Sequence, residues 1–192
     1  MLKRISKDIY YQAITHLKAG KIIAYPTEAV YGLGCDPFNE AACESLLRLK
    51  QRNRGKGLIL IAATWQHIEP LVKAISPQRQ QIVLKSWPGP YTWVFHRTSL
   101  IPNWISGVYD TVAIRITNHP VARQLCEQYG KPIVSTSANL SGQPPAKNGE
   151  EVYAQFGDAI SYIVPGSLGG LTQPTEIRDA ETHELIRFGG NI

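Results

Sequence analysis

The sequence has few acidic residues, few cysteines and no long hydrophobic segment, and each shortage excludes a class of protein. Its 192 residues include 15 Asp or Glu against 20 Lys or Arg, which gives a net charge of +5. The longest apolar run, Leu58 to Ala63, is much shorter than the roughly 20 residues of a membrane helix. Cys35, Cys43 and Cys126 have no CxxC spacing and predict reduced thiols rather than a disulfide framework. We therefore expect a soluble, cytoplasmic protein that does not contact a membrane.

Several familiar catalytic motifs are also missing. The chain has no GxxxxGK[ST] or GxGxxG phosphate loop and no GxSxG nucleophile elbow. Its 5 histidines lack metal-ligand spacing, so no resident metal site is predicted. The hydrophobic content of 43% excludes intrinsic disorder, and the length suits one domain over residues 1–192.

The apolar pattern predicts a mixture of helices and strands. Helices are expected over residues 9–17 (with Ser6 as cap and Gly20 as stop), from Asn39, from Thr64, from Ser76-Pro77, over 120–129 and over 148–156. Strands are expected near residues 21–25, 58–61, 91–96, 111–117, 132–134, 160–164, 175–178 and 185–188, and a loop over 26–37. Because several neighbouring strands lack an intervening helix, we expect an α/β fold (α+β in stricter usage) with a mixed sheet and helices on both faces.

Positive charge is concentrated in the middle of the chain. Residues 45–109 contain nine Lys or Arg and one acid, Glu69, so this stretch carries +8. Basic residues occupy every second position from Arg48 to Lys56, and in extended chain Arg52, Arg54 and Lys56 would point to one side. The alternative is an ordinary solvated basic face. Because the same segment contains two glycines, we favour an anion-binding site.

Three other polar segments are candidates for function. Thr27 follows a predicted strand and could donate to a carboxylate or phosphate, or could simply cap a turn. Arg115 lies among apolar neighbours within a predicted strand and needs an anionic partner, either a structural acid, which we favour, or a substrate carboxylate. The segment from Ser135 to Gly142 is rich in hydroxyls and suits phosphate oxygens or a nucleobase, although such segments commonly form Ser/Thr turns.

Four motifs occur in an order that resembles the YrdC family, in its short bacterial form. They are Pro26-Thr27-Glu28-x-Val30-Tyr31-Gly32-Leu33, Lys50-x-Arg52, Trp87-Pro88-Gly89-Pro90-x-Thr92 and Ser137-Ala138-Asn139-x-Ser141-Gly142. The resemblance extends from about residue 22 to 189 and implies a twisted mixed sheet around an open basic cleft. It also implies a reaction in which L-threonine, bicarbonate or CO2, and ATP give threonylcarbamoyl-AMP and pyrophosphate. The product serves the modification of tRNA beside the anticodon.

The resemblance further implies roles for individual residues. Threonine would be held by Thr27, Arg115 and Thr175. ATP would be surrounded by Lys50, Arg52, Arg54, Thr111, Ser137, Asn139 and Arg187, with Lys50 and Arg52 neutralising charge on the phosphates as catalytic residues. Mg2+ would arrive with ATP, and downstream tRNA threonylcarbamoyl-transfer proteins would receive the product.

The basic composition also permits a protein that binds double-stranded RNA or tRNA without catalysis of its own. The pI of about 9.1 favours this alternative. However, the cations lie among Gly, Ser and Thr rather than among stacking aromatics, and no RRM, KH or helix-turn-helix signature is present. RNA contact through the basic cleft could also accompany the enzymatic function. A metal-dependent enzyme acting on a sugar phosphate is disfavoured, because the cationic stretch contains only Glu69 as an acid.

Overall fold

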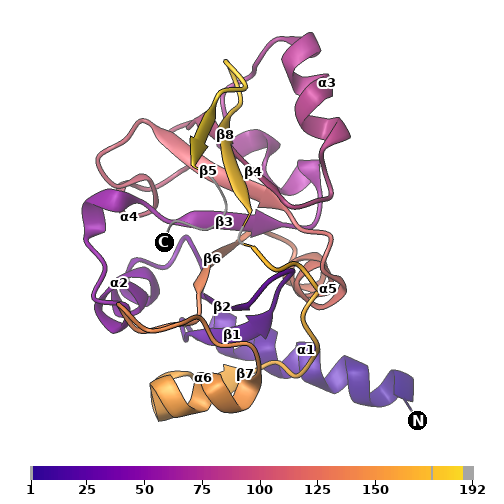
Figure 1. The fold of residues 1–192 in the computed structure, drawn as a ribbon, viewed down its shortest axis with the longest axis vertical. Helices are drawn as coiled ribbons and strands as arrows, with labels where there is room; N and C mark the ends of the chain where they lie inside the picture. Colours follow the sequence, from indigo (N-terminus) through magenta and orange to yellow (C-terminus); the bar gives the residue numbers. More distant parts are fainter. Residues whose placement is uncertain (1, 174, 188–192) are drawn as a thin grey trace.

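A single mixed sheet forms the centre of the computed structural model, which describes residues 2–173 and 175–187 (Figure 1). Within these residues the strand order is β7-β1-β2-β6-β3-β5-β4-β8-β9, with parallel and antiparallel neighbours. The strands are β1 (Ile23–Pro26), β2 (Tyr31–Gly34), β3 (Ile59–Ala62), β4 (Tyr91–His96), β5 (Thr111–Ile116), β6 (Ile133–Ser137), β7 (Tyr162–Ile163), β8 (Glu176–Asp179) and β9 (Leu185–Arg187). The predicted mixed sheet is confirmed.

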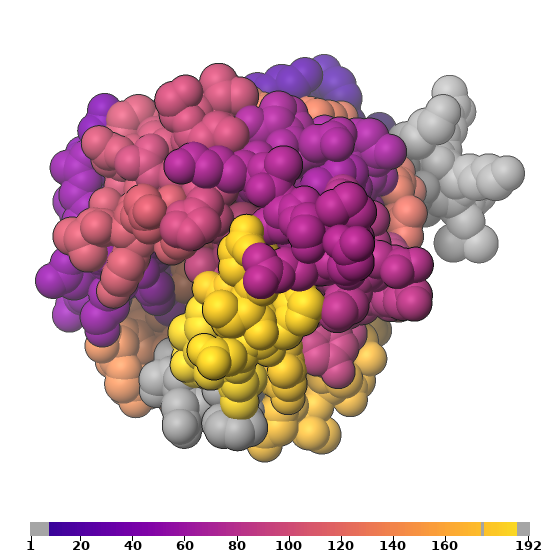
Figure 2. Space-filling view, turned by 90° about the horizontal axis from the view of Figure 1, so that it is seen from above, coloured from indigo at the N-terminus to yellow at the C-terminus, as the bar shows by residue number. Residues whose placement is uncertain are grey.

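Helices pack on both faces of this sheet, as expected. They are α1 (Leu2–Lys18), α2 (Glu40–Leu49), α3 (Pro77–Lys85), α4 (Asn103–Ser106), α5 (Pro120–Tyr129) and α6 (Gly149–Phe156). Side chains alternate along β3, so Leu60 belongs to the core beneath α2 and α6, whereas Ile61 belongs to the core beneath α1 and α5. The β8–β9 hairpin lies beside segments from the middle of the chain (Figure 2) and is tied to α3 by the ion pair of Arg79 with Glu181.

One part of the face that carries α1 and α5 is left open. Arg115 on β5 is in register with Ile61, and Ser135 on β6 is in register with Ile59. By alternation these side chains share the face of Ile61. Because α5 packs against β1 and β3, Ile59, Arg115 and Ser135 are left to line a pocket.

Strand β6 joins the two parts of the sheet and changes partners along its length. Its pairing with β3 ends at Ser135, opposite Ile59, whereas its pairing with β2 continues to Ser137. The chain before β3 turns away, since the Leu58 amide donates to the Ile105 carbonyl at 2.8 Å. The edge of β6 that faces β3 is therefore open beyond Ser135.

The prediction of a loop over residues 26–37 was wrong, because β2 lies within it. The glycines there permit close contact between strands rather than a turn. A Cβ on Gly34 would lie 2.6 Å from the Val134 carbonyl oxygen and 2.8 Å from the Tyr25 ring. Gly32 is similarly crowded by Thr27 and Tyr25.

Three of the predicted helix-end residues are confirmed, and two predicted starts are wrong. Asn39 and Ser76 cap α2 and α3 as predicted, and Gly130 ends α5 in the left-handed conformation. Ser6, predicted as a cap, lies inside α1, because the helix begins at Leu2. Thr64 begins only short 3-10 turns. It makes no side-chain cap, and Pro70 lacks the N–H that a longer helix would need.

Candidate active site

The open part of the sheet carries a cleft made of three adjoining hollows. The central hollow is lined by the polar side chains of Thr27, Arg52, Thr92, Arg115, Ser135, Thr136, Ser137, Thr175 and Arg187. A second adjoins it at Arg52 and Ser137 and contains Lys50 and Asn139, and a third adjoins it at Arg52 and Arg187 and contains Thr111. Nine of the ten residues that the resemblance assigned to ligands therefore line one cleft. Arg54 is the exception.

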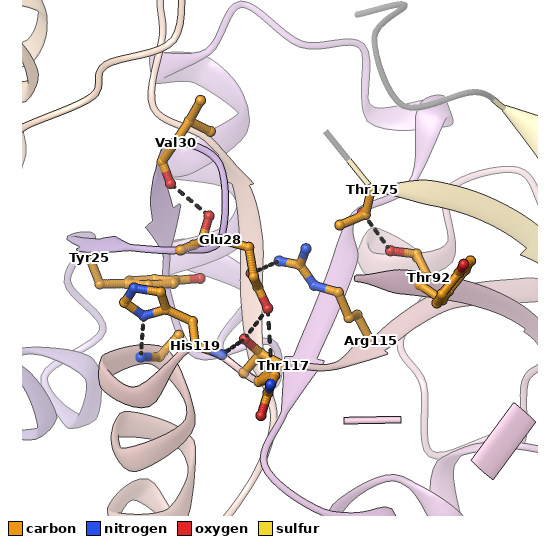
Figure 3. A network of polar contacts seen from close by, with 12 residues as sticks. Tyr25, Glu28, Val30, Thr92, Arg115, Thr117, His119 and Thr175 are labelled. Carbon is orange, nitrogen blue, oxygen red and sulfur yellow. Dashed lines mark hydrogen bonds and ion pairs between the residues drawn. The ribbon is translucent and has the colours of Figure 1, made fainter. Parts of the chain in front are cut away.

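Arg115 lies in this cleft against a buried acid, Glu28 (Figure 3). Its Nη2 is 3.4 Å from Glu28 Oε2, and the two side chains are only 10% and 9% exposed. Glu28 Oε1 accepts hydrogen bonds from Thr117 Oγ1 at 2.7 Å and from the Asn118 amide at 3.2 Å. Burial tends to raise the pKa of Glu28, but Arg115 and these hydrogen bonds outweigh it and hold the pKa below its usual value. Arg115 thus has the structural acid that the sequence favoured.

Hydroxyl groups surround the exposed side of Arg115. Thr92 Oγ1 and Thr175 Oγ1 lie 3.1 Å apart, on the side of Arg115 away from Glu28 (Figure 3). Thr27 Oγ1 donates to the Val30 carbonyl at 2.6 Å, which leaves its oxygen as an acceptor. This end of the cleft therefore combines one guanidinium with three hydroxyls.

Two further arginines make the neighbouring end cationic. Neither Arg52 nor Arg187 forms an ion pair with an acid among the described residues, and the Nε of each is buried without a hydrogen-bond partner. Burial lowers the pKa of both guanidinium groups, and Arg187 lowers that of Arg52 further. Two unpaired, partly desolvated guanidinium groups are suited to bind phosphate oxygens.

Lys50 contacts protein oxygens rather than open space. Its Nζ donates to the carbonyls of Ser137 at 2.7 Å and Asn139 at 2.5 Å, and to Asn139 Oδ1 at 2.9 Å. An ammonium has three N–H donors, so all of them are used. Burial and nearby Arg52 lower the pKa of Lys50 to about 8. In this structure Lys50 holds the end of β6 and the loop that follows it.

Arg54 lies outside the cleft. Its guanidinium pairs with Glu40 and Glu44 of α2, at 2.9 Å in each case. The extended chain expected for Arg52, Arg54 and Lys56 was wrong, because residues 54–56 form a 3-10 turn. That turn directs Arg54 toward α2 and away from Arg52.

Glu28 and Thr92 were not among the site residues predicted from sequence. Each lies in a motif of the family resemblance, but neither was assigned to a ligand. The position of Arg115 in a mostly apolar strand predicted an acidic partner, but that partner, Glu28, lies 87 positions away in the sequence. Among the described residues no group of three or more His, Cys, Asp or Glu could hold a metal ion. No described helix is long and apolar enough to cross a membrane.

Comparison with known proteins places the chain among sequences of similar length. A family model described as "Telomere recombination" (Sua5_yciO_yrdC) matches residues 15–189. The chain is 48% identical over 191 residues to the threonylcarbamoyl-AMP synthase of Klebsiella pneumoniae subsp. pneumoniae, covering 98% of this chain and 100% of that protein. It is 47% identical over 185 residues to the Coxiella burnetii protein of the same name, covering 94% and 100%.

Solved structures show the same fold. P. abyssi Sua5 complexed with L-threonine is 33% identical with a TM-score of 0.86, and the match covers 95% of this chain but 54% of that one. The chain thus spans about half the length of that protein. E. coli YciO is 25% identical with a TM-score of 0.83, covering 96% and 91%. On the family match and these identities, the chain belongs to the Sua5/YciO/YrdC family.

Proposed function

We propose that this protein is a threonylcarbamoyl-AMP synthase. The observation that carries the proposal is one cleft with two kinds of polar end. At one end a guanidinium pairs with an acid among hydroxyls, and at the other lie two guanidinium groups with no acid partner among the described residues. The names of relatives that match nearly the whole chain support it. Its substrates are L-threonine, bicarbonate and ATP.

Threonine binds at the Arg115 end. The guanidinium receives the α-carboxylate, and the hydroxyls of Thr27 and Thr175 lie close enough to the same hollow to orient the amino acid. The L-threonine complex of the P. abyssi relative supports an amino-acid site in this fold.

ATP binds along the cationic end. Arg52 and Arg187 receive phosphate oxygens, with Ser137, Thr111 and Asn139 as further polar contacts. Lys50 supports the site indirectly. Its three N–H donors already bind oxygens of Ser137 and Asn139, so it positions these residues rather than the phosphates.

The chemistry requires placement and charge stabilisation rather than a protein nucleophile. The threonine ammonium first loses a proton to solvent, and the resulting amine attacks the carbon of bicarbonate or CO2 to form a carbamate. Attack on bicarbonate releases water, and attack on CO2 releases a second proton from the nitrogen to solvent. A carbamate oxygen then attacks the α-phosphorus of ATP, and the bond to the β-phosphate oxygen breaks to release pyrophosphate. Arg52 stabilises the charge that develops on the phosphates.

Mg2+ enters with ATP in this proposal. The side chains that line the three hollows include no carboxylate, so the cleft offers hydroxyl, amide and carbonyl oxygens but no acidic ligand. Such a donor set fits an ion held mainly by phosphate and water. The product would pass to tRNA threonylcarbamoyl-transfer proteins, and the cations beside the cleft could also contact tRNA.

The test is reconstitution of the reaction. Purified protein is mixed with ATP, Mg2+, L-threonine and labelled bicarbonate, and pyrophosphate and labelled threonylcarbamoyl-AMP are measured. We expect product only when every substrate is present. Folded protein that makes no product, even with its partner proteins and tRNA added, would overturn the proposal and favour RNA binding without catalysis.

A further inference from the structure

The arginines of the cleft differ in how their charge is compensated. Arg52, Arg115 and Arg187 all line the central hollow. Of the three, Arg115 alone forms an ion pair with an acid among the described residues. A ligand that enters the hollow therefore meets a positive field at Arg52 and Arg187 and a nearly neutral pair at Arg115.

Glu28, which creates this difference, does not line any of the three hollows. It lies behind Arg115, with one oxygen fixed by Thr117 and the Asn118 amide and the other facing the guanidinium (Figure 3). Its backbone is fixed as well, because the Leu171 amide donates to its carbonyl at 2.9 Å. Glu28 is therefore a fixed negative charge that can act on a ligand only through Arg115 and through space.

We propose that Glu28 is a specificity-determining residue that makes the Arg115 end of the cleft accept a net-neutral amino acid and reject simple anions. This inference rests on the proposed function, since it concerns how the threonine end is kept distinct from the ATP end. A lone buried guanidinium would attract phosphate as strongly as Arg52 or Arg187 does. Paired with Glu28, Arg115 keeps the geometry of its donors but loses most of its long-range attraction for anions.

A zwitterion is affected differently from an anion by this pair. L-threonine carries an ammonium beside its carboxylate, so the negative charge of Glu28 attracts one group while it repels the other. A carboxylate without an ammonium, or a phosphate, experiences only the repulsion. Two unit charges a few ångströms apart in a partly buried site interact strongly enough to change binding by about tenfold or more.

The test measures ligand ranking in wild type and three variants by calorimetric titration. The probes are L-threonine and (R)-3-hydroxybutyrate, which lacks the ammonium. Glu28→Gln keeps the shape and removes the charge. Thr117→Val removes a hydrogen bond to Glu28 but keeps the charge, and Glu69→Gln removes an exposed negative charge elsewhere.

We expect wild type to prefer L-threonine to the hydroxy acid. In Glu28→Gln the affinity ratio of (R)-3-hydroxybutyrate to L-threonine should rise by about tenfold or more, whereas Thr117→Val and Glu69→Gln should keep the wild-type ratio. A purely structural role would weaken both ligands alike in Glu28→Gln, and that result would overturn the inference.

The wild-type arm keeps the inference testable if Glu28→Gln does not fold. Wild type that binds (R)-3-hydroxybutyrate as tightly as L-threonine would overturn it without any variant. Wild type that binds no L-threonine, with or without ATP, would instead overturn the proposed function. The two failures are therefore distinguishable.

Discussion

At the scale of single residues, the pairing of Arg115 with Glu28 shows what sequence reasoning can reach. A charge in the middle of a mostly apolar strand is costly unless it is paired, so the sequence predicted that Arg115 has an anionic partner. It could not identify Glu28, because the partner depends on how β1 and β5 are placed in the sheet. Thr92 was missed for a related reason, since its role depends on the approach of Thr175, which directly precedes β8.

Replacement of Glu28 by Gln should make stability less dependent on pH. The pKa of Glu28 in the folded chain is below its ordinary value of 4.5. Its charge therefore stabilises the fold fully above about pH 4.5, and this contribution is lost as pH falls through the lower, folded pKa. Urea unfolding should show Glu28→Gln destabilised by about 3 kcal/mol at pH 7, with the difference from wild type shrinking toward pH 3. An equal difference at both pH values would contradict this.

Arg52 and Arg54 should differ sharply although they are two positions apart. Arg52→Ala removes an unpaired guanidinium from the cleft, so pyrophosphate release should slow at least about tenfold. Arg54→Ala breaks ion pairs that are about half exposed, and should change the rate less than about twofold. Steady-state rates of both variants decide the matter. Equal losses of rate in the two variants would show that Arg54 contributes to the site as Arg52 does.

Lys50→Met should destabilise the protein as well as slow it. The substitution removes a donor from three oxygens at Ser137 and Asn139. The Ser137 carbonyl still accepts from the Asn139 amide and Asn139 Oδ1 from the Ser137 hydroxyl, so among the described residues the Asn139 carbonyl is the oxygen left without a partner. We expect the free energy of unfolding to fall by about 2 kcal/mol, because a buried acceptor without a partner is costly. Hydrogen exchange should also quicken in residues 137–143. Unchanged stability with reduced turnover would instead indicate that Lys50 binds the ATP phosphates directly.

At the scale of elements, residues 164–173, which follow β7, form no helix or strand and are held beside the cleft by hydrogen bonds. Its contacts are Tyr31 Oη to the Gly166 carbonyl, His119 Nε2 to the Ser167 carbonyl, the Gly169 amide to the Thr27 carbonyl, and the Leu171 amide to the Glu28 carbonyl. The segment ends near Thr175, so its anchoring helps to place that hydroxyl in the cleft.

Gly169→Ala should loosen this segment. A Cβ there would lie 2.9 Å from the Glu28 Cα and 3.3 Å from the Glu28 carbonyl oxygen. We expect a KM for threonine raised about tenfold with little change in the KM for ATP. Gly170→Ala is the matched control, since nothing lies within 4 Å and only its positive φ of 84° is strained. Equal effects of the two variants on the KM for threonine would show that the contact with Glu28 is not what matters.

Elements with a local signal were predictable, and those defined by a distant neighbour were not. The caps at Asn39 and Ser76 each accept from the amide three residues further along the chain, so a local sequence pattern predicts them. β2 has two glycines in four residues and exists because β1 and β6 lie on either side of it. The turn at residues 54–56 is an exception, because its local signal was overlooked: Asn53 Oδ1 caps it by accepting from the Gly55 amide.

At the scale of the whole molecule, the cleft is assembled from distant parts of the chain. Thr27 follows β1, Arg115 is on β5, Ser137 is on β6 and Arg187 is on β9. The strand order that brings them together does not follow sequence order, and no local pattern specifies it. The sequence therefore predicted the kind of sheet and most of the cleft residues, but not their arrangement.

Ligands that span such a cleft should stabilise the whole fold. At concentrations about 100-fold above Kd, binding adds about 2.7 kcal/mol to the free energy of unfolding. For a chain of this length, ATP with Mg2+ and L-threonine should each raise Tm by about 5–10 °C in differential scanning fluorimetry. Guanosine triphosphate and L-lysine at the same concentrations serve as controls. No shift with either substrate would argue against the cleft as their site.

Where the pairing of β3 with β6 ends, backbone groups of β6 are left free to bind other partners. In the antiparallel pairing of β6 with β2, the Ala138 amide donates to the Tyr31 carbonyl. Because the direction of backbone N–H and C=O groups alternates along a strand, the N–H and C=O of Ser137 point away from β2, toward the side where β3 pairs. The Ser137 carbonyl on that side receives Lys50, which stands where a strand would have donated. The Ser137 N–H faces the same gap. A bound phosphate oxygen would occupy the place of the missing carbonyl, so that substrate completes the sheet as an absent neighbouring strand would.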